Sequence, residues 1–103
     1  MKYNIGDKIF FAEEKLPYTV RACDNRFLVC TKVFKLRPKT VLHTIVDLEV
    51  GIRSTDGRSM GTYSYDDDYG CECNLHELQS GKSYISHVNR IALNIVKSIS
   101  GKS

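Results

Sequence analysis

The segment from Tyr18 to Thr31 constrains the fold more than any other part of the chain. Two runs rich in β-forming residues flank the pair Asp24-Asn25 there, and both residues of this pair tolerate the positive φ that a two-residue hairpin turn requires. With this pair as the loop, Cys23 lies opposite Arg26. The segment therefore predicts a two-stranded antiparallel hairpin.

The two faces of this hairpin differ in character, because successive side chains of a strand point to opposite sides. The apolar face is expected to lie on the core and carries Tyr18, Val20, Ala22, Phe27 and Val29. The other face is expected to be solvated or to contact a partner, and carries Thr19, Arg21, Cys23, Arg26, Leu28 and Cys30.

Other strand signals lie on both sides of the hairpin. Lys8 to Phe11 is a short β-rich run, and Leu16-Pro17 begins the next strand with a fixed φ. Val41 to Val50 alternates, with one face formed by Leu42, Val46, Leu48 and Val50 and the other by His43, Asp47 and Glu49. The intervening segments are predicted to be a basic loop at residues 35–39, a turn at Ser54-Thr55-Asp56-Gly57 and a short strand or irregular stretch at residues 60–65.

A helix is predicted at about residues 67–80. The carboxylates of Asp66-Asp67-Asp68 suit a helix start, since they accept hydrogen bonds from free backbone N–H groups. Cys71, Leu75 and Leu78 form one helical stripe, and Gly81 favours a helix end. A closing strand is expected from Arg90 to Ile99, packed beneath this stripe, with Ile91, Leu93, Ile95 and Ile99 on one face.

These elements predict an α+β fold: a mostly antiparallel β-sheet with an N-terminal hairpin, one helix on one face and a C-terminal closing strand. A chain of 103 residues suits a single domain over residues 1–103. A content of 42% hydrophobic and 26% charged residues is that of a globular chain and not of an extended disordered one.

The cysteines and histidines do not have the spacing of a reactive or metal-binding site. Cys23 and Cys30 are expected to lie too far apart along the hairpin, and Cys71 and Cys73 point away from each other on a helix. No catalytic or phosphate-cradling motif is present. We therefore expect a protein that is not an enzyme and that holds neither metal nor cofactor.

Positive charge is concentrated early in the sequence. Residues 15–40 contain seven Lys and Arg and one acidic residue. Such a segment fits nucleic-acid binding through phosphate contacts, although opposite charges interleaved on a solvated surface are an equal alternative. The nucleic-acid-binding candidates are Arg21, Arg26, Lys32, Lys35, Arg37 and Lys39.

Negative charge is concentrated later. Residues 41–81 contain eight acidic residues and two arginines, and tyrosines surround the acidic triplet. Tyrosine is favoured at protein interfaces, so an acidic docking patch for a protein partner is one interpretation, and tyrosines packed on the sheet edge are the other. The partner-binding candidates are Asp66, Asp67, Asp68, Glu72, Glu77, Tyr63, Tyr65 and Tyr69.

Three segments, residues 15–32 (KLPYTVRACDNRFLVCTK), 46–53 (VDLEVGIR) and 87–91 (HVNRI), resemble small uncharacterised proteins of phages and conjugative elements of Firmicutes bacteria. Proteins of that setting include anti-CRISPR inhibitors of the Cas9 nuclease, which the chain is similar to in size, charge segregation and lack of active-site motifs. The resemblance implies an inhibitor that occupies a basic channel of Cas9 or hinders assembly with its guide RNA. It transfers no functional residue.

Two functions are therefore expected. The first is a mobile-element-encoded inhibitor that binds a host defence nuclease, and the alternative is an RNA-binding accessory protein of a mobile element that uses residues 15–40. No run without a charged residue is longer than Thr40 to Val46, which is far shorter than the ~18 residues of a membrane span. The N-terminal residues contain no apolar stretch typical of a signal peptide, so a location in the bacterial cytoplasm is expected.

Overall fold

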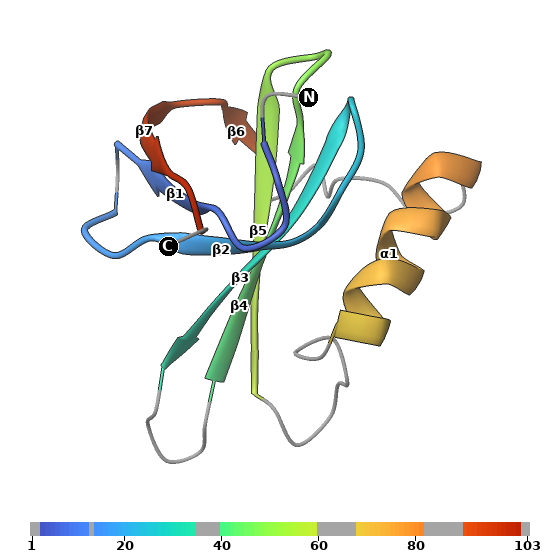
Figure 1. Cartoon of the computed structure of the whole chain (residues 1–103), viewed down its shortest axis with the longest axis horizontal. Coiled ribbons are helices and arrows are strands. Elements are labelled where there is room, and N and C mark those ends of the chain that lie inside the picture. The colour runs from blue at the N-terminus through green and yellow to red at the C-terminus, as the bar shows by residue number, and fades with distance from the viewer. Residues whose placement is uncertain (1–2, 13, 35–39, 60–67, 82–89, 102–103) are drawn as a thin grey trace.

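The computed structural model describes residues 3–12, 14–34, 40–59, 68–81 and 90–101. In these ranges the chain forms a seven-stranded antiparallel sheet and one helix, which confirms the predicted α+β class (Figure 1). The elements are β1 Lys8–Phe11, β2 Tyr18–Cys23, β3 Phe27–Phe34, β4 Thr40–Asp47, β5 Ile52–Ser59, α1 Asp68–Ser80, β6 Arg90–Ala92 and β7 Ile95–Ile99.

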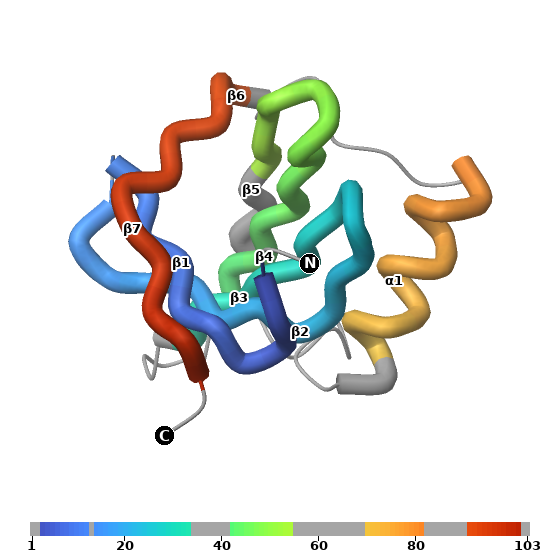
Figure 2. The backbone as a smooth tube through the Cα atoms, turned by 45° about the horizontal axis from the view of Figure 1, so that its top comes forward, coloured from blue at the N-terminus to red at the C-terminus, as the bar shows by residue number. Residues whose placement is uncertain are grey.

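The sheet is strongly curved, and its two edge strands, β6 and β7, are consecutive in the sequence. Its strand order is β6-β5-β4-β3-β2-β1-β7, and only Leu93 and Asn94 separate β6 from β7. The backbone N–H of Leu93 donates to Gly51 O over 2.8 Å, and Asn94 O accepts from Ala12 N over 2.9 Å. This link therefore joins the β4–β5 end of the sheet to the β1 end, and Figure 2 shows β6 near β5 and β7 beside β1.

The inner face of the curled sheet contains the main core. Its buried members are Tyr3, Ile9, Phe11, Tyr18, Val20, Leu28, Cys30 and Val46, with Leu42, Leu48, Leu93 and Ile95 packed against them. A second cluster lies on the outer face under α1 and consists of Ala22, Phe27, Val29, Ile45, Cys71, Leu75 and Leu78. The predicted helical stripe is thus confirmed, and the helix is followed by Gly81 with a φ of 78°.

The predicted hairpin is confirmed, but its register differs. Cys23 pairs with Leu28 and not with Arg26, so the turn spans residues 24–27. The Asp24 carboxylate sets this longer turn, because its Oδ1 accepts hydrogen bonds from the backbone N–H of Arg26 at 2.7 Å and of Phe27 at 2.6 Å. No described residue other than glycine has a positive φ, so the expected two-residue turn is wrong.

A β-bulge in β2 explains why the expected division of faces is also wrong. Val20 pairs with Cys30 and Ala22 pairs with Val29, so the register shifts at Arg21. The extra residue reverses the alternation of the strand, so Val20 faces the inner core whereas Ala22 faces the outer side. The residues expected on a single apolar face are therefore divided between the two cores, and Leu28 and Cys30, expected on the solvated face, are fully buried.

The β4–β5 region departs from expectation in two ways. Residues 54–57, predicted to be a turn, lie within β5 and pair with β4. The turn instead follows Asp47, and Gly51 adopts its positive φ of 79°. Asp47, expected on a polar face, is fully buried because its carboxylate accepts the backbone N–H of Glu49 and Val50 and binds Arg26.

The C-terminal strand is also placed differently from the prediction. It is divided into β6 and β7, which pair with β5 and β1 and not with strands under the helix. α1 packs on β2 and β3, and Figure 1 shows it on the far side of the molecule from β7. Leu93 and Ile95 pack on the inner core, whereas Ile91 and Ile99 are exposed. The expected basic loop at residues 35–39 and the segment 60–65 lie outside the described residues.

Candidate functional site

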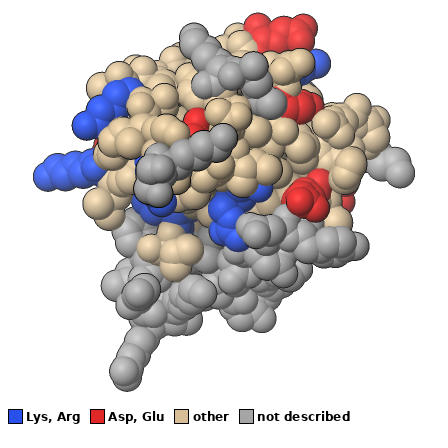
Figure 3. Space-filling view, in the orientation of Figure 1, with Lys and Arg blue, Asp and Glu red and all other residues tan. Residues whose placement is uncertain are grey.

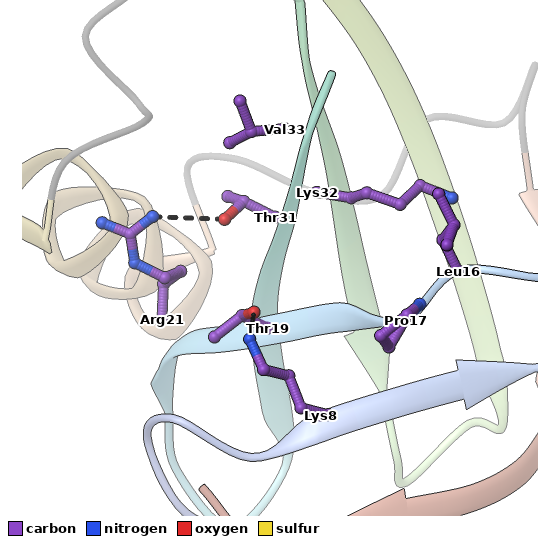
Figure 4. Close-up of a pocket in the computed structure, with 8 residues that line it drawn as sticks. All are labelled: Lys8, Leu16, Pro17, Thr19, Arg21, Thr31, Lys32 and Val33. Carbon is purple, nitrogen blue, oxygen red and sulfur yellow. Dashed lines mark hydrogen bonds between the residues drawn. The ribbon is translucent and has the colours of Figure 1, made fainter. Parts of the chain in front are cut away.

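A shallow groove of about 460 Å³ lies on β1, β2 and β3. Figure 4 shows the eight residues that line it, which are Lys8, Leu16, Pro17, Thr19, Arg21, Thr31, Lys32 and Val33. Three of these residues are cationic, two carry hydroxyl groups and none is acidic or aromatic. The groove therefore combines positive charge with hydrogen-bonding groups.

Strand register brings the polar groups of the groove together. Lys8 pairs with Thr19 across β1 and β2, and Thr19 pairs with Thr31 across β2 and β3. Directly paired residues place their side chains on the same face with Cβ atoms about 5 Å apart. Lys8, Thr19 and Thr31 thus form a polar row across three strands.

Each hydroxyl of this row holds a cation. The Lys8 ammonium donates to Thr19 Oγ1 over 2.7 Å, and the Arg21 guanidinium donates through Nη1 to Thr31 Oγ1 over 3.2 Å. Figure 4 shows Arg21 directed toward Thr31 and the Lys8 side chain ending at Thr19. Two cationic head groups are therefore anchored at neighbouring hydroxyls before any ligand binds.

The bulge in β2 sets the direction of Arg21. Bulges bend a strand locally and re-aim a side chain, and they are over-represented near functional sites. Here the residue at the shift is Arg21, and its neighbour Ala22 is buried against the helix. The bulge therefore lets β2 present a cation to the groove and an apolar side chain to α1 at consecutive positions.

Lys32 lines the groove with its aliphatic stem, but its charge is directed elsewhere. Its side chain is 9% exposed, and Nζ lies 3.0 Å from Glu14 Oε1 and 4.5 Å from the Tyr18 ring centroid. Figure 4 shows it pointing away from Arg21. Lys8 and Arg21 therefore supply the cationic head groups of the groove.

Glu14 is the centre of a cluster that includes Lys32 and lies on the inner side of the sheet. Its carboxylate accepts the Tyr18 hydroxyl over 3.0 Å and lies 3.2 Å from Nη2 of Arg53. Burial raises the pKa of the Tyr18 phenol, and its hydrogen bond with Thr44 offsets part of this effect. The phenol stays protonated at neutral pH and donates to Glu14, which thereby contacts Tyr18, Lys32 and Arg53.

Apolar residues border the groove at one end. Leu16 is 54% exposed and Val33 is 41% exposed, and Pro17 lies beside Leu16. β3 continues to Phe34, past Thr31, the last β3 residue that pairs with β2. Proline has no N–H to donate to a ladder, which accounts for the end of the pairing near Pro17.

The predicted nucleic-acid-binding residues have different environments. Arg21 and Lys32 line the groove, whereas Arg26 lies at the hairpin turn, binds Asp47 through Nε and Nη2 at 3.1 and 2.9 Å, and stacks over the Phe27 ring. Lys35, Arg37 and Lys39 lie outside the described residues.

Lys8 was missed by the sequence analysis. The sequence predicts its strand, but not the strand that pairs with it. Its place opposite Thr19 follows from the β1–β2 pairing, which no local pattern of the sequence indicates.

The predicted acidic surface is described in part. Glu72 and Glu77 are exposed on α1, and Asp68 and Tyr69 occupy its first turn. Asp66, Asp67, Tyr63 and Tyr65 lie outside the described residues. In Figure 3, acidic atoms appear on the right, where α1 lies, and at the top, whereas basic atoms appear mainly at the left and along the lower border of the described surface.

The structure gives no sign of metal or thiol chemistry in its described part. No group of three or more His, Cys, Asp or Glu residues there has the arrangement of a metal site. The four cysteines are free thiols, and burial raises the pKa of Cys23 and of Cys30. Thiols of this kind are protonated at neutral pH and react poorly. No helix in the described ranges is long and apolar enough to cross a membrane.

Comparisons with protein-family models, with curated proteins and with solved structures find no match to this chain. The likeness to mobile-element proteins therefore stays a prediction, and the groove is the feature from which a function is argued.

Proposed function

We propose that this protein is a small, non-enzymatic binding protein whose groove on β1, β2 and β3 holds the phosphate backbone of a nucleic acid. The observation that carries the proposal is the lining of the groove, in which Lys8 and Arg21 are anchored at paired threonines and none of the described residues is acidic.

The chemistry of these groups matches a phosphodiester backbone. Lys and Arg, together with Ser and Thr hydroxyls, supply most protein contacts to phosphate oxygens. Thr19 Oγ1 accepts from the Lys8 ammonium, so the Thr19 O–H can donate to a phosphate oxygen. Thr31 is 3% exposed and serves as the anchor of Arg21. Side chains that are already anchored lose less conformational entropy when a ligand binds.

The charge of the neighbouring sequence supports the same ligand. Lys35, Arg37 and Lys39 follow the groove residue Val33 closely in the sequence, and the net charge of the chain is +3. Additional positive charge on the same chain strengthens the long-range attraction of a polyanion.

The test is a salt titration with a fluorescein-labelled 20-nucleotide RNA, read by fluorescence anisotropy. Binding through phosphates predicts an affinity that falls linearly in a log–log plot against salt, with a slope of about 0.7 to 0.9 per contact. Lys8→Ala and Arg21→Ala should each reduce this slope by about one contact.

The matched control is Lys97→Ala, which removes the same charge from an exposed site on the neighbouring strand β7. It should leave the slope unchanged, because the Lys97 ammonium lies over the Phe10 ring and outside the groove. If the three variants weaken binding equally, the groove is not the site.

The acidic helix supports a second candidate function, inhibition of a host nuclease such as Cas9. Glu72 and Glu77 are exposed on α1, whose thirteen residues include no Lys or Arg. An acidic surface of this kind would compete for a positively charged nucleic-acid channel. The observation concerns two side chains, so it supports this function less strongly than the groove supports nucleic-acid binding.

A Cas9 cleavage assay tests this second function, with the protein added before or after the guide RNA. An inhibitor that acts through its acidic face should remain active in Lys8→Ala and lose potency in the double variant Glu72→Gln/Glu77→Gln. An inhibitor that sequesters the guide RNA should show the opposite pattern and act only when added first. No inhibition at large molar excess with several Cas9 orthologues would exclude both routes.

A further inference from the structure

We infer that the groove binds double-stranded nucleic acid without regard to sequence and contacts phosphate and sugar while the bases face away. This inference rests on the proposed function and specifies the class of nucleic acid that the groove accepts.

The described residues that line the groove do not have the composition typical of a single-strand binding site. Proteins that bind single strands combine a basic groove with aromatic side chains on which the bases stack, and each stacked base contributes about 1–3 kcal/mol. The eight described lining residues include no Phe, Tyr, Trp or His. They offer the bases of a single strand no aromatic stacking surface.

Among the residues that the structure describes, the lining has no Asn, Gln, Asp or Glu, the side chains that recognise adenine and cytosine. Its one arginine, Arg21, donates through Nη1 to Thr31 Oγ1, which holds the guanidinium beside that hydroxyl. The donors of the described lining are ammonium and guanidinium groups and hydroxyls, which suit phosphate and sugar oxygens.

A duplex offers the two anchored cations a higher density of phosphate charge than a single strand does. Lys8 and Arg21 are anchored on threonines that face each other across one strand pair. A duplex carries one charge per about 1.7 Å of its axis, whereas one strand carries one per about 3.4 Å. The electrostatic attraction between the groove and a duplex is therefore the stronger one.

The test is anisotropy with 20-nucleotide probes of equal length: duplex RNA, duplex DNA and the component single strands, each in two unrelated sequences. We expect the duplexes to bind several-fold more tightly than the single strands at the same salt concentration. The two sequences should agree within about twofold, because phosphate contacts carry no sequence information.

A pair of threonine variants tests the anchoring directly. Thr19→Val keeps the shape of the side chain and removes the hydroxyl that holds Lys8, whereas Thr19→Ser keeps the hydroxyl. We expect Thr19→Val to weaken binding to both duplex sequences equally and Thr19→Ser to bind like the wild type. Thermal unfolding of each variant shows whether a loss of binding reflects a loss of fold.

The outcomes separate this inference from the proposed function. Single strands that bind as tightly as duplexes, or a strong dependence on sequence, overturn the inference alone if Lys8→Ala and Arg21→Ala still reduce the salt slope. An absence of binding to every probe, or binding that these two variants leave unchanged, overturns both.

Discussion

Replacing the buried Asp47 by asparagine should destabilise the protein strongly. The Asp47 side chain is fully buried, and its two oxygens accept from Nε and Nη2 of Arg26 at 3.1 and 2.9 Å. Oδ1 also accepts the backbone N–H of Glu49 at 3.1 Å and of Val50 at 3.2 Å. One carboxylate thereby joins the β2–β3 turn to the β4–β5 turn.

The size of the effect follows from these contacts. Asparagine preserves the shape but removes the charge, and its NH₂ group faces either the guanidinium or the backbone donors. A hydrogen bond to a charged group contributes about 1.5–3 kcal/mol. Because the Arg26 side chain is 39% exposed, solvent screens part of the ion pair. We therefore expect a loss of about 3 kcal/mol, or roughly 12–24 °C in Tm for a domain of this size.

Chemical denaturation and a thermal scan followed by circular dichroism measure this loss. The matched control is Glu49→Gln, which removes the same charge two residues away. The Glu49 side chain is 70% exposed and lies 3.6 Å from Arg26 Nε, so this variant should unfold within about 0.5 kcal/mol of the wild type. If Asp47→Asn and Glu49→Gln unfold at the same temperature, the buried carboxylate does not hold the two turns together.

Three further predictions concern stability. Leu78→Ala should cost about 2–4 kcal/mol in denaturant unfolding because Leu78 is buried between α1 and the sheet, whereas the exposed Glu77→Ala should cost little. Leu93→Ala should lower the Tm because Leu93 packs on the inner core at the link between β6 and β7; a Tm equal to that of the wild type would show that this link is peripheral. Burial raises the pKa of Asp24, but hydrogen bonds from the backbone N–H groups of Phe27 and Arg26 and from Gln79 lower this pKa by a larger amount. The pKa of Asp24 in the folded protein therefore lies below its value in the unfolded chain. The stabilisation is complete above the unfolded pKa and is lost as the pH falls through the folded value, so Asp24→Asn should lose less stability than the wild type as the pH falls below about 4.

The features that the sequence predicted correctly depend on neighbours in the chain. The helix stripe of Cys71, Leu75 and Leu78 and the glycine after it are local signals, and they located α1 closely. The hairpin is also local, because two β-rich runs meet at a turn. The predicted register of the hairpin was wrong because the Asp24 carboxylate stabilises a longer turn. The residue composition of the turn does not by itself distinguish this longer turn from a two-residue turn.

The features that the sequence missed depend on partners far along the chain. Ser54 to Gly57 has the composition of a turn, but pairing along β4 keeps it in a strand. The sequence indicated Arg26 and Lys32 as cations for nucleic-acid binding. In the structure Arg26 binds Asp47, which lies 21 residues away in the sequence, and Lys32 binds Glu14. Non-local pairing thus decides which charges remain at a binding surface.

Deleting Arg21 tests whether the bulge exists to present this side chain. The register pairs Val20 with Cys30 and Ala22 with Val29, so removing the residue between Val20 and Ala22 leaves two regular consecutive pairs. Val20 would still face the inner core and Ala22 would still face α1, because the alternation is then unbroken. We therefore expect the deletion variant to fold with a Tm close to that of Arg21→Ala and to lose nucleic-acid binding to the same extent. Deleting Thr19 instead would turn Tyr18 from the inner core to the outside, and that variant should unfold. If the Arg21 deletion unfolds the protein as completely as the Thr19 deletion, the bulge is a requirement of the fold and its role at the groove is incidental.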